Sequence, residues 1–166
     1  MIAFSKMRRK RQQLSQEEAV HILCHATSGV LSVVDTNGYP YGVPLSHVYT
    51  DGKIYFHSAV SGHKIDAIHN GDKASFTVIA QDEVHPETFT THFRSVICYG
   101  RVRIVENETE KLAAIRMLGK RYNEDEVGIQ REIDKDFNHV AVIEFIIEHI
   151  TGKEAIELVR ERQTGK

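Results

Sequence analysis

The stretch GVLSVVDTNGYPYGVPLSHVYTDGKIYFHSA, residues 29–59, decides the fold. It holds three runs rich in β-branched and aromatic residues, separated by the dipeptides Asn37-Gly38 and Asp51-Gly52. Asx-Gly pairs favour tight hairpin turns because both of their residues tolerate positive φ. The stretch therefore predicts three consecutive antiparallel strands joined by two tight turns.

The sequence on either side alternates between helical and strand patterns. Ser15 with Glu18 three residues later forms a capping box, which predicts the start of a helix. Pro40 and Pro44 restrict the middle strand to an edge or an irregular part of the sheet, because proline lacks the ladder N–H. Gly100 predicts a bend or bulge within a long strand. The other elements that we expect are a helix within 14–29, a short helix at 62–70, a strand at 73–80, a polar loop at 81–89, a long strand at 90–106, a helix at 107–122, helical residues at 131–137 and a strand at 139–150.

Six or so strands in meander order, with helices between them, predict a mainly β fold with added helices, a small antiparallel barrel. The length of 166 residues suits one compact domain. Residues 1–13 contain the run KMRRKR and are expected to form a basic arm, and residues 14–166 are expected to form the domain. The pattern of residues 151–162 favours neither helix nor strand.

Composition excludes several classes of protein. The net charge of −2 gives no general attraction for nucleic acid. No apolar run approaches the ~20 residues that a membrane helix needs, and no apolar stretch follows the basic start as in a signal peptide. The two cysteines, Cys24 and Cys98, are expected to be buried small apolar residues. We expect a cytoplasmic protein without nucleic-acid or membrane partners.

The long strand is apolar on both of its faces. Val96 and Cys98 alternate with Phe93, Ile97 and Tyr99, so one set can face a barrel interior while the other points outward. A strand that is apolar on both sides is covered on both sides. In a domain this small, we expect a second subunit to provide the outer cover.

A group of polar residues lies where the third strand leads into the short helix. Ser61, Gly62, His63 and Lys64 open that helix, and free N–H groups at a helix start favour an anion such as phosphate. Strand alternation places His57 on the face away from the core, where it could contact a ligand or transfer protons. The alternative is a capped surface helix beside a half-exposed strand histidine.

Another polar group lies at the start of the long strand. Thr91, Arg94 and Ser95 could hydrogen-bond a heterocycle lying against the strand, or they could simply face solvent. His21 and His25 have the i, i+4 spacing of a metal pair, but no third ligand is evident. The spacing of the remaining histidines implies no metal, and we expect none; these are His85, His92, His139 and His149.

Several of these segments together resemble the FMN-binding split barrels of the pyridoxamine 5′-phosphate oxidase-like family. The resemblance is strongest to the branch of nitroimidazole-resistance (Nim-type) proteins, and it covers roughly residues 7–153. The segments that carry it are MRRKRQQLSQEEAVHIL, GVLSVVDTNGYPYGVPLSHVYTDGKIYFHSAVSGHKIDAI, FTTHFRSVICYGRV and ITGK.

This resemblance implies a split antiparallel β-barrel that binds FMN at the interface of a homodimer. It implies that the phosphate is held by His63 and Lys64. It implies further flavin contacts from the ends of two strands and from the start of the long strand, namely Pro44, Leu45, Ser46, His57, Ser58, Ala59, Thr91, Arg94 and Ser95. The oxidases themselves have an arginine at the position of His63 and a glutamine at the position of Ser95, so the Nim-like branch fits better.

The activity implied by the resemblance is the reduction of a small-molecule acceptor, such as a nitroimidazole, by reduced FMN. His57 is the expected catalytic residue, as a proton donor or a ring contact to the acceptor. Two alternatives remain open from the sequence: a heme-binding or heme-degrading split barrel, and a non-catalytic flavin-binding protein.

Overall fold

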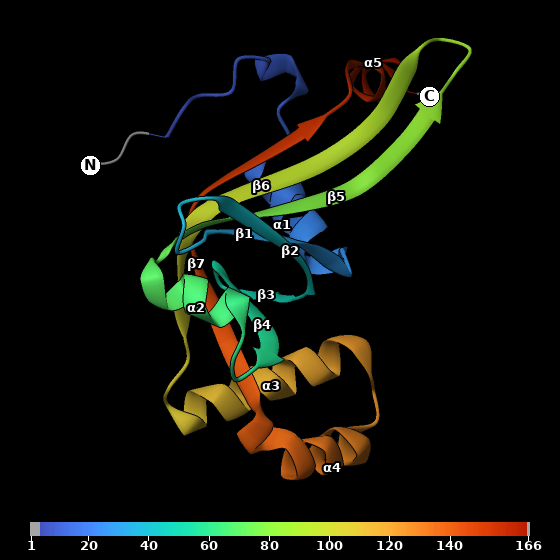
Figure 1. Ribbon diagram of the computed structural model, residues 1–166. Coiled ribbons are helices and arrows are strands. Elements are labelled where there is room, and N and C mark those ends of the chain that lie inside the picture. The colour runs from blue at the N-terminus through green and yellow to red at the C-terminus, as the bar shows by residue number, and fades with distance from the viewer. Residues whose placement is uncertain (1–3, 166) are drawn as a thin grey trace.

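The computed structural model describes residues 4–165, which fold around one strongly curved antiparallel sheet (Figure 1). Within these residues the chain forms seven strands, five α-helices and two short 3-10 helices. The elements are η1 (Lys10–Gln12), α1 (Gln16–His25), β1 (Ser28–Val34), β2 (Pro40–Ser46), β3 (Val48–Thr50), β4 (Lys53–Ala59), α2 (His63–Asn70), β5 (Lys73–His85), β6 (Thr90–Ile104), α3 (Glu108–Tyr122), α4 (Glu126–Asp136), η2 (Phe137–His139), β7 (Val140–Glu154) and α5 (Ile156–Thr164).

The order of strands in the sheet is β2-β1-β5-β6-β7-β4-β3, and every neighbouring pair is antiparallel. β2 and β3 stand at opposite ends of this order, yet only His47 separates them in the chain. The two edges of the sheet must therefore meet at His47, and the sheet closes into a split barrel. This confirms the predicted fold class, a mainly β domain with added helices.

Local turn chemistry forms both of the predicted hairpins. Asp51 (φ 45°) and Gly52 (φ 79°) make the two-residue turn between β3 and β4, where positive φ at both positions matches the strand twist. The loop between β1 and β2 is longer than the predicted tight turn and has five residues. The Asp35 N–H donates to the Tyr39 carbonyl across it, and Gly38 (φ 84°) lies inside it. β2 is an edge strand, as its two prolines predict.

The predicted meander order holds for β5, β6 and β7 but is wrong at two points: the predicted middle strand divides at His47 into β2 and β3, and β4 does not pair with β5. β4 pairs with β7 along its whole length, from Lys53 opposite Ile146 to Ala59 opposite Val140. α2 instead carries the chain to the other side of the sheet, where β5 pairs with β1 and β6. The β4–β7 and β1–β5 pairings bury β-branched and aromatic side chains. Neither pair of strands is joined by a turn that the sequence could have revealed.

The polar loop predicted at 81–89 is also wrong for its first half. β5 continues to His85, and cross-strand pairs run from Gln81 opposite Arg94 to His85 opposite Thr90. Residues 86–89 alone form the turn. β5 and β6 thus extend beyond the barrel as a long curved ribbon whose far end lies beside α5 (Figure 1). The backbone groups of this ribbon are paired across the two strands, so its polar side chains do not prevent strand formation.

The core lies inside the barrel and takes side chains from strands in both halves of the sheet. Its largest fully buried side chains include Leu31, Phe56, Phe76 and Phe145, with the Phe56 and Phe76 rings edge to face at 5.1 Å. A second, smaller cluster lies outside the barrel, where α3 covers β4 and β7; its members are Tyr55, Val105, Ala114, Leu118 and Val142. Both faces of β4 are therefore covered.

Three further expectations can be compared with the fold. Gly100 does lie at a register shift between β6 and β7, and a Cβ there would collide with the Ile146 carbonyl oxygen. Cys98 is buried as expected, but Cys24 is exposed because α1 buries the face that carries Ala19 and Leu23. Residues 151–154 complete β7, and α5 follows them.

The outer face of the long strands is partly covered by the chain itself. The Phe4 ring stacks on His149 of β7 with centroids 4.7 Å apart and lies 5.7 Å from Tyr99 of β6. Tyr99 nevertheless stays 42% exposed, and Ile79 on the neighbouring strand is 69% exposed. Apolar surface thus remains open on this face.

No helix among residues 4–165 has the length and apolar character needed to cross a membrane.

A buried carboxylate joins three elements near the closed end of the barrel. Glu144 on β7 is fully buried and accepts hydrogen bonds from Lys53 Nζ (2.8 Å), Tyr55 Oη (2.8 Å) and Arg103 Nε (2.7 Å). Burial would raise the pKa of Glu144, but these donors outweigh it and lower the pKa to about 2. Glu144 is therefore ionised in the folded protein at any ordinary pH.

Replacing Glu144 with glutamine should lower the free energy of unfolding at pH 7 by about 2–3 kcal/mol, because Lys53 and Arg103 then lose their partner. The folded pKa lies below the unfolded value of 4.5, so the stabilisation is complete above that value and is lost as pH falls toward 2. The difference between wild type and variant should shrink over this window in urea unfolding. The matched change Glu148→Gln, at an exposed position of the same strand, should cost ~1 kcal/mol or less. A constant difference across the window would contradict this assignment.

Candidate functional site

The candidate site begins where β4 ends and α2 starts. Gly62 is the N-cap residue of α2 with φ 123°, a conformation that favours glycine, and no side chain caps the helix. The Ser61 hydroxyl, which precedes it, does not cap the helix. Ile65 and Asp66 N–H both donate to the Gly62 carbonyl, while a helix start leaves its earliest N–H groups free for other acceptors. The start of α2 can therefore still offer backbone N–H groups to an anion.

Lys64 provides the positive charge of this region, and His57 lies close enough to feel it. Burial lowers the pKa of the half-buried Lys64, and among residues 4–165 no carboxylate forms a salt bridge with it. His57 lies on β4 opposite Val142 and stays partly open to solvent. Surrounding protein desolvates the imidazole and, together with the Lys64 charge, lowers the pKa of His57. An anion near Lys64 would relieve both effects.

His63 is partly committed to the protein. Its Nε2 lies 2.7 Å from Asp35 Oδ1, and its ring stacks on Tyr41 with centroids 4.4 Å apart. The His63 hydrogen bond is the main reason that the pKa of Asp35 is lowered. The ring is thereby fixed between β2 and the loop that follows β1, with Nδ1 left as the atom that could serve a ligand.

A cavity of about 390 Å³ opens beside His57, between α3 and α4. Its lining is mostly apolar, with a few polar groups at the margin, which is the usual character of small-molecule sites. The lining residues are His57, Ile115, Leu118, Gly119, Tyr122, Asn123, Gly128, Ile129, Glu132, Ile133, Asp136, Phe137 and Val140. Only His57 of this set could be predicted from the sequence, because α3 and α4 show no more than an amphipathic helical pattern.

One wall of the cavity is held by a hydrogen-bond cluster that the sequence did not predict. The Tyr122 hydroxyl accepts from the His47 N–H (3.0 Å) and lies 2.8 Å from the carbonyl oxygens of both Thr27 and His47. The His47 ring is fully buried, with Nε2 2.9 Å from the Leu23 carbonyl oxygen. Burial lowers the pKa of His47, so this ring is neutral at pH 7.

The other predicted residues near β4 lie on strand ends. Ser58 and Ala59 continue β4 opposite Ala141 and Val140 of β7. The remaining three, Pro44, Leu45 and Ser46, form the end of β2, where Leu45 packs against the core and its two neighbours are exposed.

The residues predicted on β6 form a separate group. Strand alternation puts Thr91 and Ser95 on the opposite face from Arg94. Arg94 is directed toward α5 and pairs with the buried Glu154 at 3.3 Å. His57, through β7, lies near the other end of β6, where Ile104 pairs with Ile143. Along β6, roughly 30 Å of extended strand separates Ser95 from Ile104, whereas Pro44 lies level with Ile97 through β1 and β5.

The family model described as pyridoxamine 5′-phosphate oxidase matches residues 15–154. No curated protein gives a significant match.

Several solved structures share the fold. A provisionally assigned 5-nitroimidazole antibiotic resistance protein from Bacteroides thetaiotaomicron superposes with a TM-score of 0.70, at 21% identity, over 86% of each chain. A FAD-binding protein from Mesorhizobium loti gives a TM-score of 0.65 at 23% identity, over 87% of this chain and 97% of that one. A FAD and heme binding protein from Mycobacterium smegmatis gives 0.73 at 17% identity, over 87% and 73%. At these identities the likeness concerns the fold.

Replacing Lys64 with glutamine should raise the pKa of His57 toward its ordinary value, because the nearby positive charge that disfavours the imidazolium is removed. The measurement is an NMR titration of the His57 ring protons in wild type and variant. Lys135→Gln, on the exposed surface of α4, is the matched control and should leave the titration unchanged. Identical His57 titrations in wild type and the Lys64 variant would mean that the two side chains are not neighbours in solution.

Proposed function

The chain belongs to the pyridoxamine 5′-phosphate oxidase family, and on that premise we propose that it binds FMN and uses it to reduce a small-molecule acceptor. The single observation that carries the proposal is the position of Lys64. It is a half-buried cation without a carboxylate partner among residues 4–165, at a glycine-capped helix start, and its charge reaches His57, which lines a cavity. Such a cation lacks the counter-charge that a phosphate would supply.

The phosphate would lie against the start of α2. Lys64 would donate to it from Nζ, and the first N–H groups of the helix would donate as well. His63 would join through Nδ1 while Asp35 holds the ring by Nε2. The carboxylate of Asp35 is already engaged by His63 and by the Thr36 N–H, so its charge is partly neutralised before an anion arrives.

The flavin ring would extend from there past His57, Ser58 and Ala59 and the end of β2 at Pro44–Ser46. When bound, the flavin would supply the electron-transfer chemistry that no side chain of this site can provide. The protein would position it and exclude water from one side.

We extend the proposal to a homodimer with the flavin at its interface. Through β7, His57 lies toward the opposite end of β6 from Thr91 and Ser95, while Pro44 lies level with Ile97 through β1 and β5. This spread favours a ligand shared between two chains. A second copy would supply Thr91 and Ser95 from its own β6. The exposed Ile79 and Tyr99 offer apolar surface for such an interface.

The acceptor would enter the cavity beside His57. Its volume of about 390 Å³ and its mostly apolar lining suit a small heterocycle, and a nitroimidazole is the class suggested by one structural neighbour. His57 is neutral at pH 7 because its pKa is lowered, so it can contact an uncharged ring without desolvating a charge. The same lowered pKa makes its protonated form a stronger acid, suited to delivering a proton to the reduced acceptor.

Cofactor identity is tested by adding FMN, FAD or heme to separate samples of the purified protein and recording visible spectra. We expect tight uptake of FMN with a shifted two-band flavin spectrum. Lys64→Gln should weaken FMN binding by about ten- to a hundredfold, since one charge-assisted hydrogen bond is worth about 1.5–3 kcal/mol. Lys135→Gln should bind FMN as the wild type does. A Soret band with heme and no flavin uptake would replace this proposal by a heme-binding one.

Catalysis is tested with the FMN-loaded protein and a nitroimidazole under chemical reduction of the flavin. His57→Ala should slow acceptor reduction at least about tenfold, within the range of a lost proton donor, and should change FMN affinity by no more than about threefold. His69→Ala, an exposed position in the last turn of α2, is the matched control. Unchanged turnover in His57→Ala would remove this residue from the mechanism, and absent turnover with FMN bound would leave a flavin-binding protein.

A further inference from the structure

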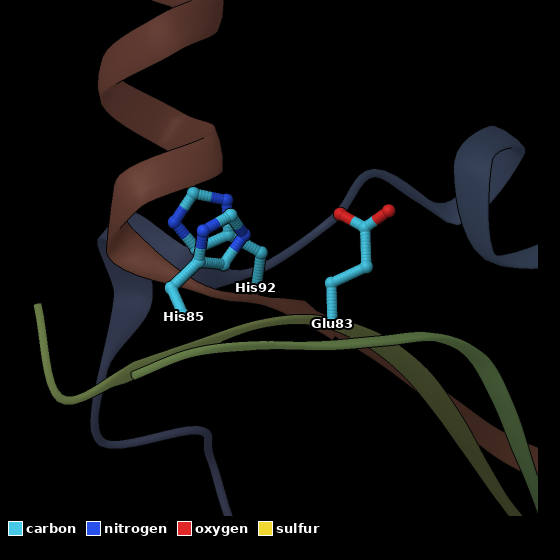
Figure 2. Close-up of side chains that lie close together, drawn as sticks. All are labelled: Glu83, His85 and His92. Carbon is cyan, nitrogen blue, oxygen red and sulfur yellow. The ribbon is translucent and has the colours of Figure 1, made fainter. Parts of the chain in front are cut away.

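Two histidines and a glutamate meet on one face of the β5–β6 ribbon, far from His57 and Lys64. Glu83 pairs directly with His92 across the two strands, and His85 is two residues further along β5. Residues two apart on a strand share a face, so all three side chains point to the same side. Figure 2 shows them on the side of the ribbon that faces α5.

We propose that Glu83, His85 and His92 bind a divalent transition-metal ion, with Zn²⁺ as the best match. Each residue offers one ligand atom, and the three atoms lie within 4.8 Å of one another. Two imidazole nitrogens and one carboxylate oxygen form a His₂Glu donor set, which suits zinc with water as a fourth ligand. Nitrogen donors disfavour Mg²⁺ and Ca²⁺, which prefer oxygen.

The surroundings of the two rings favour metal binding through Nε2. His85 Nδ1 lies 3.2 Å from Glu87 Oε1, and His92 Nδ1 lies 3.8 Å from Glu161 Oε1 on α5. Glu87 can accept a hydrogen bond from His85 Nδ1, which leaves the lone pair on Nε2, the arrangement that usually supports a metal-bound histidine. Glu161 lies beyond hydrogen-bond distance of His92 Nδ1 and contributes its charge only. His85 Nε2 is itself buried and has no hydrogen-bond partner among the described residues.

The third ligand is also oriented. Gln81 Nε2 donates to Glu83 Oε2 at 3.1 Å, which leaves Oε1 available to an ion. The nearby cation, Arg94, is engaged by Gln81 at 3.3 Å and by the buried Glu154, so its charge is already compensated. An arriving divalent ion thus meets two imidazole nitrogens and a carboxylate oxygen.

A modest movement is needed to bind the ion. The His85 and His92 rings lie at a centroid distance of 3.9 Å with 32° between their planes. An imidazole donates in its own plane, so the rings have to tilt further apart until both lone pairs converge. Ligand atoms around tetrahedral zinc are about 3.4 Å apart, so the three donors also have to draw together by roughly 1 Å.

Metal binding would have a structural consequence at this end of the molecule. Glu161 joins α5 to the site through His92, so an ion would fix the tip of the ribbon against α5. That tip carries Val84 and Phe89, which are 68% and 96% exposed. The site is independent of the flavin proposal, because it shares no residue with it.

The test is calorimetric titration of the full-length, chelator-treated protein with ZnCl₂, and with MgCl₂ as a comparison. We expect one Zn²⁺ per chain, no Mg²⁺ binding, and a rise in the thermal midpoint on adding Zn²⁺. His85→Ala and His92→Ala should each weaken Zn²⁺ binding by about a hundredfold or more, beyond the ~10–100-fold typical of an outer partner, and Glu87→Gln should cost about tenfold. Glu83→Gln keeps the shape of an exposed side chain and should weaken binding without affecting folding.

His21→Ala provides the matched control. His21 and His25 on α1 form another histidine pair with ring centroids 3.9 Å apart, but they have no place in the His₂Glu set. Zn²⁺ binding and the zinc-dependent thermal shift should be unchanged in this variant. The proposal is overturned if the wild type binds no Zn²⁺, if the His85 and His92 variants bind as the wild type does, or if His21→Ala abolishes binding.

Discussion

Closure of the barrel depends on one corner of the chain, at His47. There the backbone leaves β2 at one edge of the sheet and enters β3 at the other. A residue at such a corner cannot use its N–H and C=O in a ladder, and burying them unpaired would cost about 1–3 kcal/mol each. The Tyr122 hydroxyl meets both groups at once, and the Leu23 carbonyl meets the ring. The same contact brings the end of α3 to β4 and so forms the cavity beside His57.

Two buried carboxylates then hold the long strand β7 at its two ends. Glu144 near the cavity gathers Lys53, Tyr55 and Arg103, and Glu154 near the ribbon gathers Arg94 and Arg162. Each carboxylate is fully buried while its arginines are half-exposed. The free-energy cost of desolvation is therefore borne mainly by the carboxylate. β7 contacts both β4 and β6, so fixing its ends also fixes the distance between the two ends of the molecule.

Sequence reasoning succeeded where structure is local and failed where it is not. Asp51-Gly52 specifies its own backbone angles, and Gly100 marks a bulge by lacking a side chain, so both could be recognised from the sequence. The pairing of β4 with β7 joins residues some 90 positions apart and leaves no local signal. Residues 81–85 are polar, yet they form a strand because backbone pairing alone suffices in an exposed ribbon. His85 and His92 looked unrelated for the same reason: once 81–89 is taken as a loop, nothing brings them together.

The direction of each side chain on β6 also limits which of them could contact a flavin shared between two chains. Arg94 was expected beside Thr91 and Ser95, but it points to the opposite face and is neutralised by Glu154. To reach a ligand on the other face it would have to give up its pairing with the fully buried Glu154, which would keep Arg162 as its remaining arginine. Thr91 and Ser95 carry no such commitment. If a second chain completes the flavin site, hydroxyl groups of β6 rather than its arginine would therefore face the cofactor, and Arg94 would serve to fasten α5 to the sheet.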